Sequence, residues 1–163
     1  MTDPLSPSAG KVQQVLKTLG LSCQVTEMSA TTRSAEDAAR AVGCEVGQIA
    51  KSLVFKGASS HRGVLVITSG ANRVNESALA RLLGESILKA DADFVRQTTG
   101  FAIGGVPPVG HQQPLTVLID EDLFDYPDIW AAAGTPKAVF KLTPQELQNI
   151  TGGRVVCVKS SPA

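Results

Sequence analysis

Apolar residues recur at helical spacing in five segments of the chain. In the first, hydrophobic positions three and four apart run from Val12 to Leu19 and stop at Gly20, which predicts a helix over residues 11–19. Capping residues followed by similar spacing predict the other four helices, at residues 34–43, 75–84 and 91–97 and from Thr143 onward. A single turn of helix is also expected within residues 46–50.

Alternating and β-branched hydrophobic runs predict strands between these helices. The predicted strands cover residues 22–28, 52–55, 63–68, 115–120, 129–133, 138–142 and 154–159. A polar loop joins the second of them to the third, and this arrangement predicts a β-hairpin. Cys157 lies inside the last alternating run, so we expect it in the core.

The order of these elements indicates the fold class. Because strands and helices are mixed without regular strand–helix–strand units, we predict an α+β fold, a single mixed α/β domain. The 163 residues are the length of about one domain. Residues 1–10 lack the basic start and apolar core of a signal peptide and are expected to form a flexible arm, with the folded domain at residues 11–160.

Charge and composition exclude several classes of function. The chain carries 15 basic and 15 acidic residues, and this balance argues against a broad grip on a nucleic-acid backbone such as DNA. Seven aromatic residues are too few for a stacking platform. No apolar run is long enough for a membrane span, so a cytoplasmic protein without membrane contact is expected. Three scattered cysteines and two histidines predict no metal site.

Within the segment from Thr99 to His111, residues 104–110 combine three glycines and two adjacent prolines in a rigid loop. Composition alone leaves open whether this is a turn or a binding loop. Its glycines at 105 and 110 have the spacing of a P-loop, but His111 and Gln112 stand where that motif needs Lys and Ser or Thr. The Gly104 and Gly105 N–H groups could instead stabilise an oxyanion.

Lys51 stands directly before an apolar strand. It is either a solvated strand end or a cation held over a cleft, where it would meet a phosphate or a carbonyl oxygen. Ser69, Gly70 and Asn72 follow the next strand, either as a plain loop or as a second polar wall beside Lys51. His111 is either a base or a solvent-exposed loop residue.

Four segments together, residues 48–55, 64–68, 98–111 and 116–120, resemble the YbaK/EbsC family of aminoacyl-tRNA editing domains, which also occur inserted in bacterial prolyl-tRNA synthetases. The resemblance runs from the first helix to about Val158. It implies a curved, barrel-like sheet flanked by helices, and hydrolysis of the ester between a wrong amino acid and the 3′ end of a tRNA. It implies neither metal nor cofactor.

The resemblance also assigns site residues. Lys51 matches the family's essential lysine and, with Gly104 and Gly105, is predicted to be catalytic. The predicted substrate-binding residues are Met28, Ser69, Gly70, Asn72, Gly100, Phe101, Val106, Pro107, Pro108, Gly110, His111 and Ala132. The branch of the family that removes cysteine has a tyrosine near Met28 and a serine near Ala132. Their absence here leaves alanine, serine and threonine open beside cysteine.

The function predicted from these residues is that of a free-standing trans-editing deacylase. Its expected substrate is the 3′ end of a mischarged tRNA, most simply tRNA(Pro), and prolyl-tRNA synthetase is an expected partner. A non-catalytic module that binds tRNA or a synthetase remains the alternative, because the sequence shows no clear general base. A small-nucleotide-binding protein ranks third.

Overall fold

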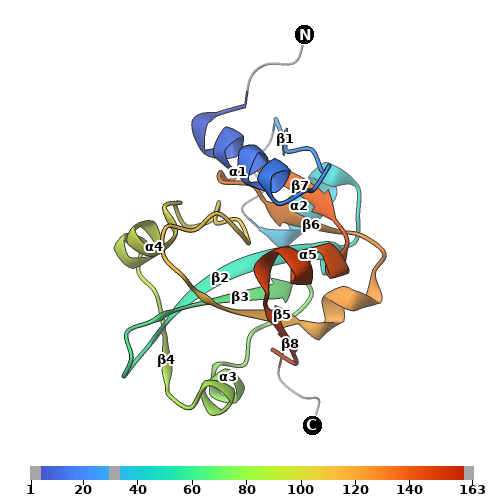
Figure 1. Cartoon of the computed structure of the whole chain (residues 1–163). Coiled ribbons are helices and arrows are strands. Elements are labelled where there is room, and N and C mark those ends of the chain that lie inside the picture. The colour runs from blue at the N-terminus through green and yellow to red at the C-terminus, as the bar shows by residue number, and fades with distance from the viewer. Residues whose placement is uncertain (1–4, 30–33, 160–163) are drawn as a thin grey trace.

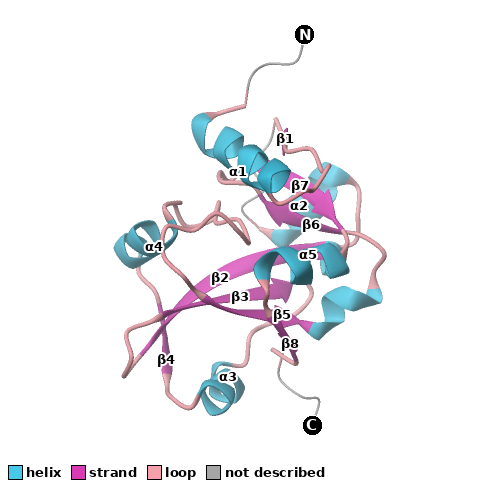
Figure 2. Ribbon diagram, viewed as in Figure 1, coloured by secondary structure: helices cyan, strands magenta, loops and turns pink. Residues whose placement is uncertain are grey.

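Strands of the computed structural model, which describes residues 5–29 and 34–159, form one mixed sheet with helices around its periphery (Figures 1 and 2). The α-helices are α1 (Pro7–Thr18), α2 (Ala35–Val42), α3 (Glu76–Leu83), α4 (Ala92–Thr99) and α5 (Pro144–Thr151). The short 3-10 helices are η1 (Val46–Gln48) and η2 (Glu121–Asp125). The strands are β1 (Thr26–Glu27), β2 (Ile49–Gly57), β3 (Gly63–Ser69), β4 (Ile87–Lys89), β5 (Thr116–Asp120), β6 (Ile129–Ala132), β7 (Ala138–Leu142) and β8 (Arg154–Val156).

The sheet has the strand order β1-β7-β6-β2-β3-β5-β8, and β4 pairs with β2 away from this path. Three neighbouring pairs are parallel, β2 with β6, β3 with β5 and β5 with β8, and the others are antiparallel. The predicted hairpin is the antiparallel pair β2–β3. The predicted class, a mixed α/β domain with a mixed sheet, is therefore confirmed.

Helix ends follow the capping signals in the sequence. Four N-cap side chains accept a hydrogen bond from the backbone N–H three residues on: Ser34, Asn75, Asp91 and Thr143. The same four helices end at a glycine in the left-handed conformation, which lacks the steric cost that a Cβ atom would add. These local signals explain why the helix positions were predictable.

Three expectations differ from the structure. Helix α1 begins at Pro7, because proline suits the first turn of a helix and Ala9 packs into the core, so residues 7–10 are not part of an arm. The strand expected over residues 22–28 shortens to β1, whose two residues pair with β7. Cys157 is exposed, because β8 ends at Val156 and the chain turns Val158 inward instead.

Strand β3 is buried on both faces of the sheet. Leu65 and Ile67 belong to the main core, which α1 and β7 also build, whereas Val64 and Val66 face a smaller core that includes Leu79 of α3. A strand buried on both faces reads as a continuous apolar run, as β3 does.

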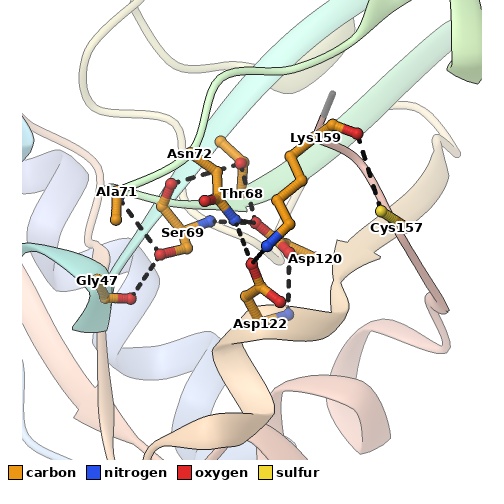
Figure 3. Close-up of polar contacts among 9 residues, drawn as sticks. All are labelled: Gly47, Thr68, Ser69, Ala71, Asn72, Asp120, Asp122, Cys157 and Lys159. Atoms are coloured by element: carbon orange, nitrogen blue, oxygen red, sulfur yellow. Dashed lines mark hydrogen bonds and ion pairs between the residues drawn. The ribbon is translucent and has the colours of Figure 1, made fainter. Parts of the chain in front are cut away.

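A cluster of polar side chains ties the ends of β3 and β5 together (Figure 3). Asp120, fully buried, accepts hydrogen bonds at Oδ2 from Thr68 Oγ1 (3.2 Å), Ser69 N (2.9 Å) and Asn72 Nδ2 (2.8 Å). Its Oδ1 accepts from the backbone N–H of Asp122 at 2.9 Å. A buried carboxylate with this many donors is compensated for the loss of water.

The same cluster reaches the last described residues of the chain. Lys159 Nζ lies 2.7 Å from Asp122 Oδ2, which also accepts from Asn72 Nδ2 at 2.8 Å (Figure 3). The hydrogen bonds from Lys159 and Asn72 lower the pKa of Asp122, and the Asp122 carboxylate raises the pKa of Lys159. Because both side chains are partly exposed, water screens their attraction and the pair contributes little stability.

The second half of the glycine–proline loop packs inward beside α1. Pro107, Pro108 and Val109 are buried, and Gly110 lies against Val15 of α1. The His111 ring contacts the Pro107 carbonyl oxygen through Nε2 at 2.7 Å. Burial lowers the pKa of His111, with a smaller contribution of the same sign from Lys11, and the neutral ring donates to this carbonyl.

Replacing Asp120 by alanine should destabilise the fold by about 3 kcal/mol, because several buried donors lose their common acceptor. Urea unfolding of the variant and the wild type measures this difference. Asp125→Ala is the matched control, since Asp125 is exposed. Equal unfolding midpoints for the Asp120 and Asp125 variants would show that the cluster does not hold the two strand ends.

His111 should make the free energy of unfolding depend on pH. Its folded pKa is lowered, so below its ordinary value of about 6.5 the unfolded chain binds the proton more readily and stability falls. Above that value the contribution is constant. We expect His111→Gln to flatten the loss of stability below about pH 6.5, measured by urea unfolding at several pH values. His61→Gln, at an exposed position, should keep the wild-type slope.

Candidate functional site

The outer edge of β2 is only partly paired. Along the edge that faces away from β3, β6 pairs with Ile49 and Ala50, and β4 pairs with residues 55–57. Both partners are short strands, so neither reaches residues 51–54 with a strand pairing. A stretch of strand edge in the middle of the sheet is therefore open.

A cavity of about 430 Å³ lies at this opening. All residues of β2 from Ile49 to Phe55 line it. The other lining residues come from α2, β4, α4, the glycine–proline loop, β6 and β7: Ser34, Ala35, Ala38, Lys89, Ala90, Val95, Ile103, Gly104, Val106, Trp130, Ala131, Ala132 and Val139. This volume suits a small molecule or the end of a larger one.

The first half of the glycine–proline loop forms one wall of the cavity. Ile103, which is 57% exposed, Gly104 and Val106 line it. Gly104 has a φ of 92°, which glycine adopts without strain. Gly105 is held against the neighbouring turn, where its carbonyl oxygen accepts from Gly134 N at 2.9 Å and an added Cβ would meet the Thr135 backbone at 2.8 Å. The loop can take this path only with glycine at 105.

Charge at the cavity is one-sided. Lys51 and Lys89 line it, and none of its described lining residues is acidic. Neither lysine forms an ion pair within residues 5–29 and 34–159. In a chain of zero net charge, two unpaired cations beside an apolar cavity favour an anionic ligand.

Four predicted site residues meet at this cavity: Lys51, Gly104, Val106 and Ala132. Lys51 is half-buried and lies within β2 instead of before it. Gly105 does not line the cavity, and its N–H donates to the Ala102 carbonyl at 3.1 Å. The Gly105 N–H, one of the two donors expected to stabilise an oxyanion, is therefore already used.

The other predicted residues lie elsewhere. Ser69 and Asn72 belong to the polar cluster around Asp120, and Gly70 packs against the Val46 carbonyl oxygen. Met28 follows β1 and donates its N–H to Lys137. Residues of the loop and its flanks that do not line the cavity are Gly100, Phe101, Pro107, Pro108, Gly110 and His111.

Sequence reasoning missed several lining residues. Lys89 lies on β4, a strand too short to show a period, and Trp130 lies on β6 at the far side of the cavity. Ser52 was read only as part of a strand. Its hydroxyl oxygen is buried and has no hydrogen-bond partner among the residues that the structure describes. The strand that became β6 was predicted, but nothing in its apolar pattern marked Trp130 as a lining residue.

The lining restricts the chemistry that the cavity can perform. It contains no Cys, His, Asp or Glu among the described residues, so a thiol nucleophile and an imidazole or carboxylate base are not available there. No group of three metal-ligating side chains occurs within the described ranges. What the cavity offers is a cation, backbone polar groups and an apolar enclosure, which suits catalysis by positioning.

None of the helices that the structure describes combines the length and hydrophobicity needed to cross a membrane.

Comparisons with known proteins agree with this geometry. A crystal structure of a provisionally assigned trans-editing enzyme for prolyl-tRNA synthetase superimposes with a TM-score of 0.92 at 50% identity, covering 97% of this chain and 100% of that one. EbsC of Enterococcus faecalis, provisionally assigned as a Cys-tRNA(Pro)/Cys-tRNA(Cys) deacylase, is 29% identical over 74% of each chain.

The proline–tRNA ligase of Limosilactobacillus fermentum is 30% identical over 112 residues, which are 66% of this chain but only 20% of the ligase. This chain therefore corresponds to one segment of that enzyme. The sequence model of the aminoacyl-tRNA editing domain matches residues 29–150. With three quarters of its length inside that match, the chain belongs to the aminoacyl-tRNA editing domain family.

Proposed function

We propose that this protein is a free-standing trans-editing deacylase that hydrolyses the ester of a mischarged tRNA, with tRNA(Pro) carrying Cys, Ala, Ser or Thr as its substrates. The observation that carries the proposal is the acid-free cavity at the open edge of β2, with Lys51 in its wall. Membership of the editing-domain family supports the reaction class. The provisional assignments of the two relatives above support tRNA(Pro).

The size of the cavity suits a terminal nucleoside with its amino acid and excludes a folded tRNA. In this proposal the protein holds only the 3′ end, which agrees with its zero net charge. Lys51 contacts the terminal phosphate or ribose, and Lys89 at the mouth attracts the preceding phosphates. The body of the tRNA stays outside.

Water is the nucleophile in the proposed reaction. It attacks the ester carbonyl carbon, the bond to the ribose oxygen breaks, and that oxygen takes up a proton to give the free tRNA end and the free amino acid. With the ester fixed beside Lys51 in an apolar enclosure, orientation and electrostatic stabilisation supply the rate enhancement. No protein nucleophile is required.

Small amino acids fit this lining best. Ala35, Ala38 and Ala132 each contribute only a methyl side chain to the lining, which Trp130 and Ile49 share. Met28 lies outside the lining, so the residue type at position 28 does not decide specificity through direct contact. A pocket of this kind separates amino acids that differ by one methylene by about 1–3 kcal/mol, which favours a relaxed choice among small side chains.

We further propose that the protein acts in the cytoplasm, where tRNA is charged, and that it acts on tRNA released by prolyl-tRNA synthetase. The absence of an imidazole or carboxylate base in the described cavity lining favours one rival, a module that binds the tRNA end without hydrolysing it. Turnover distinguishes the two: a deacylase releases many amino acids per protein molecule, and a binding module releases none.

Removing the Lys51 cation should lower kcat/KM for deacylation by about 100-fold or more, the usual loss for one electrostatic contact in a closed site. The assay follows loss of radiolabelled amino acid from tRNA(Pro) charged with Cys, Ala, Ser or Thr. Lys51→Ala is compared with Lys51→Arg, which keeps the charge.

Lys17→Ala is the matched control, because Lys17 is an exposed lysine of α1 that does not line the cavity. Thermal unfolding of each variant checks that the fold is kept. Undiminished activity of Lys51→Ala would remove Lys51 from its assigned role. Stable esters on all four tRNAs at micromolar wild-type protein would contradict deacylation of tRNA(Pro) itself.

A further inference from the structure

The direction of backbone groups along β2 singles out one residue at the open edge. In a strand the N–H and C=O of one residue point to the same side, and alternate residues share that side. Ile49 C=O accepts from Gly70 N beside β3, whereas Val54 C=O accepts from Ala90 N on the outer edge. The even-numbered residues therefore direct their backbone groups outward, and Ser52 is one of them.

Ser52 lies between the two strand partners of that edge. Ala50 pairs with Ala131 of β6, and Val54 is bonded to Ala90, but no described strand pairs with Ser52 there. Ser52 lines the cavity and keeps part of its surface accessible, although its hydroxyl oxygen is buried. The accessible part of Ser52 therefore includes atoms other than the hydroxyl. A backbone N–H and C=O directed into an apolar cavity lack the compensation that buried polar groups require.

An aminoacyl ester has the atoms of one peptide residue: a nitrogen donor, an α-carbon and a carbonyl acceptor. Two residues in a hydrogen-bonded antiparallel pair exchange both of their N–H to C=O bonds. We propose that the aminoacyl group of the substrate pairs with Ser52 as a single added strand residue, filling the gap between β6 and β4. This inference rests on the proposed deacylase function and names the group that the site recognises.

The direction of this pairing follows from where the nucleotide must go. In an antiparallel pair the substrate's carboxyl side runs toward the residue before Ser52, which is Lys51. The ester oxygen, ribose and phosphate then lie on the Lys51 side, and the ammonium group lies toward Val54. A parallel arrangement would carry the nucleotide away from Lys51, toward Val54. The antiparallel arrangement also continues the direction in which β4 runs along the same edge.

The pairing has a chemical consequence. The Ser52 N–H donates to the ester carbonyl oxygen, and the Ser52 carbonyl oxygen accepts from the substrate ammonium. As water adds to the carbonyl carbon, the oxygen gains negative charge and the Ser52 hydrogen bond strengthens, which lowers the barrier. The Ser52 N–H thus takes the role that was expected of the Gly105 N–H. The Gly105 N–H already donates to the Ala102 carbonyl oxygen.

The test compares esters that differ only at the nitrogen, on wild-type protein. Alanyl-, lactyl- and propionyl-tRNA(Pro) carry an ammonium, a hydroxyl and a hydrogen at the same carbon. Each enzymatic rate is divided by the spontaneous hydrolysis rate of the same ester, because the ammonium itself activates the ester. We expect propionyl-tRNA to lose about tenfold or more of the rate enhancement seen with alanyl-tRNA, and lactyl-tRNA to fall between them.

Ser52→Ala separates the main chain from the side chain. Because the proposed pairing uses backbone groups, the ratio between the alanyl and propionyl rate enhancements should persist in this variant. Loss of the ratio would assign ammonium recognition to the hydroxyl and overturn the main-chain pairing.

Equal rate enhancements for the alanyl and propionyl esters on wild-type protein would overturn the inference while leaving the deacylase function intact. If the wild type hydrolyses none of the four aminoacyl-tRNAs, the proposed function fails, and the pairing fails with it.

Discussion

The unpaired stretch of β2 is the constraint on which the rest of this structure depends. A strand edge within a sheet must be paired, covered or used, because its backbone groups otherwise lack partners. Here β6 and β4 stop short of each other along one edge of β2, and side chains from α2, α4, β7 and the glycine–proline loop enclose the space between them. The cavity is thus a product of the strand lengths, and residues 49–55 of β2 line it.

The segment of β2 that lines the cavity is held rigid along its other edge. The long pairing with β3 fixes the register, in which Lys51 lies opposite Thr68. Thr68 and Ser69 are in turn held by the buried Asp120, and the Ser69 hydroxyl donates to the Gly47 carbonyl at 2.8 Å, just before β2 begins (Figure 3). The residues predicted as a polar wall therefore stabilise the end of β3, the strand that pairs with Lys51, and they do not line the cavity.

An element could be predicted from the sequence when the residues that determine it lie close together in the chain. Caps at Asn75 and Thr143, and the apolar runs of β3 and β5, act within a few residues, and their elements were predicted closely. Strand β4 has three residues, and its place beside β2 depends on pairing across some thirty positions, so no period revealed it. Lys51 and Gly104 were candidates from their own sequence context, and the resemblance assigned their roles, whereas Lys89 and Ser52 required the structure.

The two parts of the glycine–proline loop have different roles, and composition alone could not show this. From Pro107 onward it is buried beside α1, where the neutral His111 ring closes on the Pro107 carbonyl. Gly105 is fixed by Gly134 and cannot hold a Cβ against Thr135. Its neighbours Ile103, Gly104 and Val106 shape the cavity wall, and Ile103 is exposed. Because its contacts with residues 134 and 135 hold this wall in place, it restricts the volume open to a group that enters the cavity beside Lys51.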